Sequence, residues 1–273
     1  MIVFVYGTLL RGMSRAHAMD EARFLGLGEI AGCLYDLGSY PGLVEGKGRI
    51  MGELYDVDEV TLESLDRIEG FKTDEPAFSL YIRTLRQATF FNDGRNETVS
   101  VYLYNGEIGS REQIKHGDYR RFTELHQNGA TYYIAYGSNL NQERLENRIG
   151  SVHVITRGYI NGFELCFNKE NVDGTSYANI KAGEPEVRLP FVAYELPDGL
   201  GQIDLLDGYE GAPNTYRRIA YPFPLQGSRV TKLGFMYVAS PTLITEEAEP
   251  PHAYLAHIQK GYAEHGFTWT AVE

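Results

Sequence analysis

The feature that most constrains this chain of 273 residues is an internal repeat, because four short motifs occur twice in the same order. Tyr81, Arg83 and Tyr102 each recur 135 residues later. The motifs are Tyr-Gly with a following hydroxyl residue at 6–8 and 136–138, Leu-Asp-x-x-Glu-Gly at 65–70 and 206–211, Tyr-x-Arg at 81–83 and 216–218, and a tyrosine in an apolar run at 102 and 237. Four matches in one order indicate a duplicated domain. We therefore predict two domains, at 1–128 and 129–273.

The composition is that of a globular protein, and it narrows the choice of partners. Hydrophobic residues make up 43% of the chain and charged residues 23%, which suits two domains that each bury a core. The formal net charge of −12 disfavours nucleic acid and anionic membrane surfaces, so we expect neither as a partner. The charge identifies no substrate or partner protein, because a basic pocket can exist on an acidic protein.

Cysteine usage and the first residues predict a cytoplasmic protein. Cys33 and Cys166 stand alone in apolar stretches without CxxC spacing, which disfavours a disulfide framework or a structural metal site. The chain starts in a strand-like run that lacks the features of a signal peptide. No stretch approaches the roughly 18 apolar residues of a membrane helix. A reducing cytoplasm suits these features.

Hydrophobic periodicity predicts an α+β fold in which short strands outnumber helices. The predicted helices span 59–69, which Gly70 follows, and 201–211, which ends at Gly211; both glycines suit a helix C-terminal cap. Two further helices are predicted at 110–127 and 251–265, at the end of each half. The predicted strands span 2–6, 30–37, 50–57, 80–91 and 98–104, then 131–136, 159–167, 190–196, 216–222 and 230–239, with a Pro/Gly loop at 38–48. Because no βαβ alternation appears, we predict a mixed or antiparallel barrel-like sheet flanked by helices in each half.

The first candidate site element is the glycine turn. A strand that ends in Tyr-Gly-Thr or Tyr-Gly-Ser presents consecutive N–H groups and a hydroxyl group, which can hold a carboxylate or a phosphate. A turn glycine with a small polar follower is also common for structural reasons alone. Its occurrence in both copies favours function. It matches neither a Walker A motif nor a dinucleotide-binding fingerprint.

The second candidate element is the glutamate of the Leu-Asp-x-x-Glu-Gly motif. Glu69 and Glu210 each end a predicted helix, where the helix dipole disfavours a negative charge. We expect the pKa of such an acid to be raised, which suits general acid–base chemistry near neutral pH. A solvated acid at a helix end is the alternative, and recurrence in both copies argues against it.

Other repeated polar residues are interpreted as structural at this stage. Asp66 and Asp207 lie three residues before the glutamates and on about the same helix face, and Tyr102 and Tyr237 resemble buried tyrosines that need one hydrogen-bond partner. The seven histidines do not cluster in metal-binding spacing. No Ser–His–Asp or Cys–His arrangement recurs in both halves.

These motifs carry a resemblance to a known superfamily. The first half, with 4–9, 52–57, 65–70 and 81–83, resembles the AIG2-like branch of the gamma-glutamylcyclotransferase superfamily, which includes gamma-glutamylamine cyclotransferases. The second half, with 136–140, 163–167, 206–211 and 258–261, is more similar to gamma-glutamylcyclotransferase proper. As a whole, the chain resembles the tandem-domain bacterial members.

The resemblance implies a small β-barrel flanked by helices in each half, with no metal and no cofactor. It implies that Glu69 and Glu210 are the catalytic residues. It implies further that the Tyr-Gly turns, with the tyrosines of the apolar runs, bind the gamma-glutamyl group. The substrate-binding residues would be Tyr6, Gly7, Thr8, Leu9 and Tyr102 in the first half, and Tyr136, Gly137, Ser138, Asn139 and Tyr237 in the second.

The implied reaction is an internal attack of the α-amino group on the gamma-carbonyl carbon, which yields 5-oxoproline and a free amine. Two alternatives stay open, a non-catalytic module that binds an amino-acid-like ligand and an amide hydrolase that uses the same glutamate. The copies also differ, because Thr8-Leu9 stands where the second copy has Ser138-Asn139. The extra segment 72–77 of the first copy could cap or obstruct its site.

Overall fold

The computed structural model describes residues 1–126, 129–228 and 230–269. The chain divides into two compact units, which are described separately. The first unit comprises Met1–Phe90 and Arg95–Thr123, and the second comprises Phe91–Gly94 and Glu124–Glu273. The predicted domain boundary at 128 lies outside the described residues.

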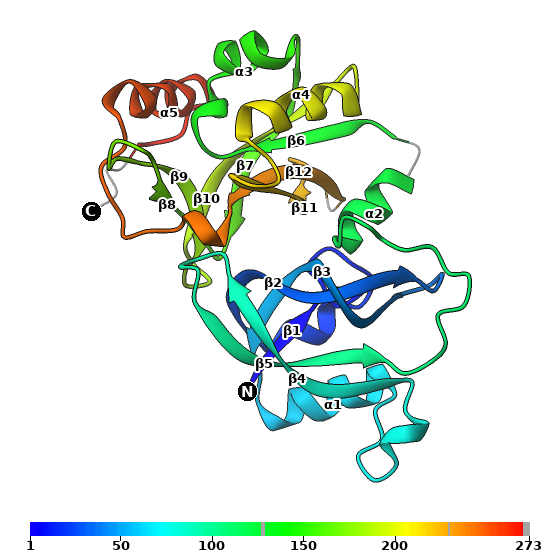
Figure 1. Ribbon diagram of the computed structural model, residues 1–273. Coiled ribbons are helices and arrows are strands. Elements are labelled where there is room, and N and C mark those ends of the chain that lie inside the picture. Colours follow the sequence, from blue (N-terminus) through cyan, green and yellow to red (C-terminus); the bar gives the residue numbers. More distant parts are fainter. Residues whose placement is uncertain (127–128, 229, 270–273) are drawn as a thin grey trace. The chain divides into compact units, whose positions relative to one another are not determined.

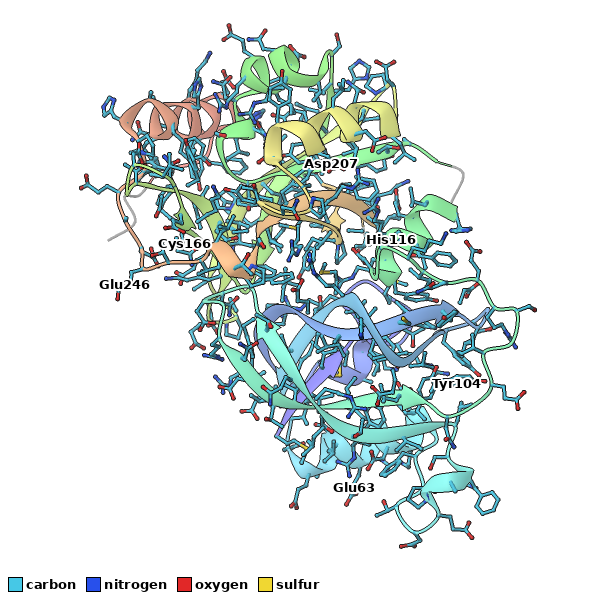
Figure 2. All side chains as sticks on the ribbon, in the orientation of Figure 1. Glu63, Tyr104, His116, Cys166, Asp207 and Glu246 are labelled. Carbon is cyan, nitrogen blue, oxygen red and sulfur yellow. The ribbon has the colours of Figure 1, made fainter. Side chains whose placement is uncertain are left out.

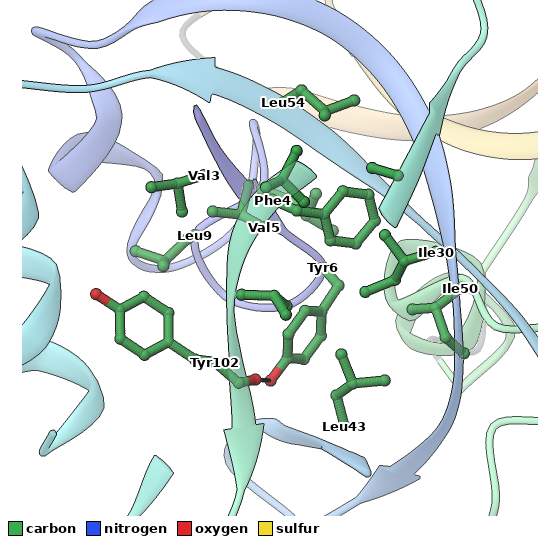
Figure 3. Packing of buried hydrophobic residues seen from close by; sticks show 14 of the residues in the cluster. Val3, Phe4, Val5, Tyr6, Leu9, Ile30, Leu43, Ile50, Leu54 and Tyr102 are labelled. Atoms are coloured by element: carbon green, nitrogen blue, oxygen red, sulfur yellow. Dashed lines mark hydrogen bonds between the residues drawn. The ribbon is translucent and has the colours of Figure 1, made fainter. Parts of the chain in front are cut away.

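The first unit is a closed five-stranded barrel with strand order β1-β3-β2-β4-β5 (Figure 1). Neighbouring strands are antiparallel except β1 and β5, which are parallel. The strands are β1 (Ile2–Val5), β2 (Arg23–Asp36), β3 (Pro41–Asp56), β4 (Tyr81–Phe90) and β5 (Asn96–Tyr104), and two short 3₁₀ helices, η1 (Ala16–Met19) and η2 (Pro76–Phe78), lie in the connections. Figure 3 shows the barrel core, where β-branched and aromatic side chains of several strands pack around Tyr6.

The prediction of a loop at 38–48 is wrong, because β3 begins at Pro41. Leu34 pairs with Leu43 and Cys33 pairs with Val44, so β2 and β3 form one long hairpin. Glycines within 42–48 weaken the sequence signal for a strand. A side chain at Gly46 would collide with Cys33 Sγ, so the glycine allows the close approach of the two strands.

Helix α1 (Glu59–Glu69) follows β3 and has the predicted limits. The Asp58 side chain caps its N-terminus by accepting a hydrogen bond from the Thr61 N–H at 2.8 Å. Leu65 is fully buried and anchors the helix. Gly70 ends it in the left-handed conformation with φ of 65°, which glycine adopts without steric cost. The sequence therefore places Glu69 in the last turn.

The second unit contains a five-stranded mixed sheet of order β11-β12-β6-β10-β7 and a separate two-stranded sheet, β8-β9. Its strands are β6 (Thr131–Ala135), β7 (His153–Asn161), β8 (Phe163–Glu170), β9 (Ser176–Ala182), β10 (Arg188–Leu196), β11 (Tyr216–Pro224) and β12 (Thr231–Ala239). The strand predicted at 159–167 is interrupted by Gly162, whose φ is 76°. This break separates β8 from β7. The α+β class predicted from the sequence is confirmed, and the closed barrel is found in the first unit.

Three α-helices, α3 (Gln142–Ile149), α4 (Leu200–Glu210) and α5 (His252–His265), accompany the sheets of the second unit, with 3₁₀ helices η3 (Ser138–Leu140) and η4 (Pro241–Leu243). Figure 1 shows α3, α4 and α5 together on one side of the five-stranded sheet. Gly211 ends α4 in the left-handed conformation, with φ of 62°, as Gly70 ends α1. The sequence prediction missed α3.

The helix predicted at 110–127 is shorter than expected. Helix α2 spans Tyr119–His126, because Gly117 has φ of 70° and cannot continue a helix in that conformation. Asp118 then accepts a hydrogen bond from the Arg121 N–H at 3.1 Å and caps the helix start. Among the described residues, no helix is long and apolar enough to span a membrane.

Candidate functional sites

The first glycine turn follows β1 and is held by Tyr6. The Tyr6 hydroxyl donates a hydrogen bond of 2.6 Å to the backbone carbonyl of Tyr102, which Figure 3 marks as a dashed line. A Cβ atom at Gly7 would lie 2.8 Å from Cγ of Pro41, closer than side chains tolerate. Close packing therefore requires glycine at this position. The turn closes with a hydrogen bond of 3.1 Å from the Leu10 N–H to the Gly7 carbonyl.

The two residues inside this turn offer backbone donors. Within the described part of the chain, the N–H groups of Thr8 and Leu9 donate to no protein acceptor. Both residues are buried, and both line a pocket that also contains Glu69. Buried N–H groups are nearly always satisfied in folded proteins. These two donors are therefore suited to an anionic group of a bound ligand.

Glu69 lines the same pocket as this turn and lies at the C-terminal end of α1. No described residue forms a hydrogen bond or an ion pair with its carboxyl group. Burial raises its pKa to about 7, against an opposing effect of the nearby Arg15 guanidinium. The pKa of Glu69 is therefore raised, as predicted, but burial is the main cause of the increase. Such a carboxyl group can exchange a proton near neutral pH.

The first pocket is narrow, with a cavity volume of about 60 Å³. Among the described residues, Arg15 is the one cation that lines it, and its guanidinium lies 3.5 Å from the Ile68 carbonyl oxygen. The remaining wall is largely aromatic and aliphatic, formed by residues that include Tyr40, Pro41, Leu80, Tyr81 and Tyr102.

Three repeated residues of the first unit form one polar network beside the pocket. Asp66 Oδ1 accepts a hydrogen bond from the Tyr102 hydroxyl at 2.7 Å and lies 3.2 Å from Arg83 Nε. The Tyr102 ring lines the pocket, while its hydroxyl group is engaged by Asp66. All three residues belong to the repeated motifs, but their mutual contacts were not predicted from the sequence.

The second unit repeats this network. The Tyr237 hydroxyl donates to Asp207 Oδ1 at 2.7 Å, and Arg218 Nη1 lies 2.9 Å from Asp207 Oδ2. Figure 2 shows Asp207 on the side of α4 that faces the strands. The Tyr136 hydroxyl donates to the Tyr237 carbonyl, as Tyr6 does to Tyr102. The duplication therefore preserved the hydrogen bonds and ion pairs around the site as well as its motifs.

The second glycine turn forms η3 and differs in its contacts with the glutamate. Asn139 Nδ2 donates to Glu210 Oε1 at 3.0 Å and to the Tyr133 hydroxyl at 2.9 Å. Arg148 Nη1, from α3, lies 3.2 Å from Glu210 Oε1 and 3.0 Å from Asn139 Oδ1. Leu9 replaces Asn139 in the first copy and cannot make these bonds.

Glu210 is therefore a paired acid, whereas Glu69 is not. Burial raises the pKa of Glu210, and Arg148, Asn139 and Arg144 oppose this increase. The carboxyl group lines a small cavity of about 30 Å³ with Gly137, Ser138, Asn139 and Tyr237. It also lines a larger cavity of about 530 Å³. The second site thus has an additional space beside the catalytic candidate.

The large cavity contains residues that the sequence analysis missed. They are Arg144, Arg148, Lys169, Tyr177, Tyr254 and His257. The Asn141 side chain accepts a hydrogen bond from the Arg144 N–H and caps α3, and Leu145 and Ile149 are buried on its inner face. The pattern of a capping asparagine followed by these two apolar residues could have revealed the helix.

Metal-binding groups do not assemble in either unit. Across residues 1–126, 129–228 and 230–269, no three His, Cys, Asp or Glu side chains lie where they could hold a metal ion. Cys166 is buried and Cys33 partly exposed, and neither forms a disulfide.

Comparison with known proteins identifies the family of this fold. The family model described as gamma-glutamyl cyclotransferase, AIG2-like, matches residues 3–121 and 133–258. A Vibrio cholerae relative, named as a gamma-glutamylcyclotransferase, is 50% identical over 120 residues, which are 43% of this chain and 94% of the relative. A Niallia circulans protein named gamma-L-glutamyl-butirosin B gamma-glutamyl cyclotransferase is 31% identical over 129 residues, which are 46% of this chain and 80% of that protein.

A solved structure covers both units. The crystal structure of YkqA from Bacillus subtilis superposes with a TM-score of 0.67 and 22% identity, over 96% of this chain and 91% of that one. At this identity the likeness concerns the fold, and the family assignment rests on the two matched segments. The chain therefore belongs to the AIG2-like gamma-glutamyl cyclotransferase family and carries two copies of the family's domain.

Proposed function

We propose that the protein is a cofactor-independent gamma-glutamyl cyclotransferase that converts gamma-glutamyl compounds into 5-oxoproline and a free amine or amino acid. The observation that carries the proposal is a partly buried carboxyl group that shares a pocket with a glycine turn, once in each unit. A relative whose name states this type of reaction supports the reaction class. The proposal includes a cytoplasmic location, which suits two cysteines that form no disulfide.

In the proposed complex, the glycine turns bind the gamma-glutamyl group. The N–H groups of Thr8 and Leu9 receive its α-carboxylate in the first site, and Ser138 and Asn139 take that role in the second. Tyr6 and Tyr136 hold the turns through their bonds to strand carbonyls. The rings of Tyr102 and Tyr237 form pocket walls. The substrate is thereby held in a folded conformation, which favours an intramolecular reaction.

Glu69 and Glu210 act as the general acid–base groups. The carboxylate accepts a proton from the substrate α-ammonium group, and the resulting amine attacks the gamma-carbonyl carbon. A new C–N bond closes the five-membered ring, and the glutamate returns its proton to the nitrogen of the leaving group as the original C–N bond breaks. The ring nitrogen loses its second proton to the released amine, so the products are a neutral lactam and an ammonium ion. The reaction consumes no water and needs no redox partner. A pKa of about 7 for Glu69 suits a group that must both accept and donate a proton.

The proposal is tested by product analysis with the full chain. The protein is incubated with a panel of gamma-glutamyl dipeptides and gamma-glutamylamines, and 5-oxoproline and glutamate are quantified. We expect 5-oxoproline together with an equimolar amount of the leaving amine. Free glutamate as the product would instead indicate an amide hydrolase. Saturable binding without any product would indicate a ligand-binding module. Glu69→Gln and Glu210→Gln, tested separately, assign turnover to the two sites.

A further inference from the structure

The large cavity beside Glu210 contains two cations, Arg144 and Lys169, that form no direct ion pair with any described residue. Its lining includes Arg144, Arg148, Lys169 and one acid, Glu210. Arg148 is the cation that pairs with that acid. Arg144 and Lys169 form no hydrogen bond through their side chains and no ion pair with any described residue. The cavity therefore carries an excess of positive charge on a protein whose net charge is −12.

Lys169 is the more deeply buried of the two. Lys169 lies in β8 and is only 9% exposed, and burial lowers the pKa of its ammonium group. The ammonium nitrogen lies 5.2 Å from the centroid of the Tyr177 ring and 6.0 Å from that of Tyr216. These cation–π contacts offset part of the cost of burial. A buried charge is normally paired with an opposite charge, so the site lacks a component that an anionic ligand can supply.

Arg144 points to the same conclusion independently. Its Nε atom is buried and has no hydrogen-bond partner among the described residues. Burial lowers the pKa of its guanidinium group, and the like charge of Arg148 adds to this effect. Guanidinium groups bind carboxylates and phosphates through paired N–H groups. An anion in this cavity would satisfy the unpaired donor and neutralise part of the charge.

Two other lysines of the second unit pair with acids. Lys181 lies 2.5 Å from Glu247 and 3.3 Å from Glu164, and Lys260 lies 2.6 Å from Glu143. Lys169 is less exposed than either of these lysines, yet it has no ion-pair partner among the described residues.

We propose that Arg144 and Lys169 form an anion subsite of the second unit, which binds a negatively charged group on the leaving amine of the substrate. The inference rests on the proposed function and deepens it. Glu210 lines both the small cavity with the glycine turn and the large cavity with the two cations. A gamma-glutamyl compound at the turn would therefore extend its leaving group toward the cations. The first pocket, at about 60 Å³ against about 530 Å³, has no comparable space.

The test compares substrates that differ in the charge of the leaving group. In a Glu69→Gln background, turnover is measured for gamma-glutamyl-alanine, gamma-glutamyl-alaninamide and the gamma-glutamyl derivative of 2-aminoethyl phosphate. We expect the KM of at least one anionic substrate to be about tenfold lower than that of the amide, the effect of one charged hydrogen bond. The two anionic substrates distinguish a carboxylate from a phosphate ligand. Equal KM values for all three substrates would overturn the inference.

Matched variants assign the effect to the two cations. Lys169→Met keeps the length of the side chain and removes a buried charge, and Arg144→Gln removes the guanidinium group. Either change should bring the KM values of anionic and neutral substrates together. Lys181→Met, which removes a paired surface lysine, should leave the difference intact. A difference that survives in both cavity variants would contradict the assignment.

The two levels of the proposal fail in different ways. Absence of 5-oxoproline from all substrates would contradict the proposed function, and calorimetric titration of the Glu69→Gln protein with the same compounds would then test the subsite directly. Tighter binding of an anionic compound, lost in Lys169→Met, would support it. Production of 5-oxoproline without charge preference would retain the function and remove the subsite.

Discussion

Arg148 Nη1 lies 3.2 Å from Glu210 Oε1 and 3.0 Å from Asn139 Oδ1, so one guanidinium nitrogen bridges the glutamate and the glycine turn of the second unit. Glu69 has no ion-pair partner among the described residues. The two proposed catalytic acids therefore differ in electrostatics although their helices end alike. This difference predicts unequal responses to pH and to mutation.

The first prediction concerns removal of the Arg148 charge. Because Arg148 favours the ionised form of Glu210, Arg148→Met should raise the pKa of that carboxyl group. The general base is active when ionised, so the acidic limb of the pH dependence of kcat/KM should move to higher pH. The profile is measured in a Glu69→Gln background. The same substitution combined with Glu210→Gln is the control, because only the Glu69 site is then active and its profile should not move.

The second prediction concerns stability and pH. The pKa of Glu69 is about 7 in the folded protein and near 4.3 in an unfolded chain. The unfolded state therefore loses this proton first as pH rises, so ionisation of Glu69 favours unfolding between these two values. Glu69→Gln should increase the free energy of unfolding by roughly 3–4 kcal/mol at pH 8, since each pKa unit corresponds to about 1.4 kcal/mol, and have little effect at pH 4.

The measurement is denaturant unfolding of the full chain at the two pH values. Glu63→Gln is the matched control, because Glu63 is an exposed acid on the same helix (Figure 2). Equal effects of Glu69→Gln at pH 4 and pH 8 would show that burial does not penalise the ionised carboxyl group.

The third prediction compares the two glycine turns. A methyl group at Gly7 would lie 2.8 Å from Pro41 Cγ, whereas one at Gly137 would lie 3.3 Å from Ala178 Cβ. Gly7→Ala should therefore displace its turn and reduce kcat/KM of the first site by about tenfold or more, since small misplacements weaken catalysis strongly. Gly137→Ala should affect the second site less. Each glycine variant is tested by steady-state kinetics with the other site inactivated, by Glu210→Gln for Gly7→Ala and by Glu69→Gln for Gly137→Ala. A larger loss of kcat/KM for Gly137→Ala would contradict the prediction.

The fourth prediction separates the ring of Tyr102 from its hydroxyl group. Because the hydroxyl donates to Asp66 and the ring lines the pocket, Tyr102→Phe should lower stability by about 1 kcal/mol with little change in KM. Tyr102→Leu should raise KM as well. Substrate titration and denaturant unfolding measure the two effects. A large increase in KM for Tyr102→Phe would show that the hydroxyl group contacts the substrate.

Local signals in the sequence were sufficient for several elements of the site. The apolar periodicity of 59–69 and the following glycine predicted α1 and its end, so Glu69 could be placed in a final helical turn. The repeat located the corresponding helix and Glu210. The same local rules failed at 38–48 and at 110–127, because glycine can join strands closely in one place and stop a helix in another.

Other features depend on tertiary contacts that local patterns do not encode. The pairing of Arg83 with Asp66, and of Tyr102 with the same acid, follows from how the barrel packs against α1. Burial, rather than the helix dipole, is the main reason for the raised pKa of Glu69. Arg148 reaches Glu210 from a short, mostly polar helix; its cap and two apolar residues could have indicated the helix, but neither they nor the repeat indicated the contact with Glu210.

The central claim is that Glu69 and Glu210 carry the chemistry of two cyclotransferase sites. The most direct measurement is the rate of 5-oxoproline release by Glu69→Gln/Glu210→Gln relative to the unmodified chain, at pH 8 and saturating substrate. Loss of general acid–base catalysis should lower kcat by about 100-fold or more, while circular dichroism confirms that the double variant is folded. A folded double variant that releases 5-oxoproline at the unmodified rate would contradict the claim.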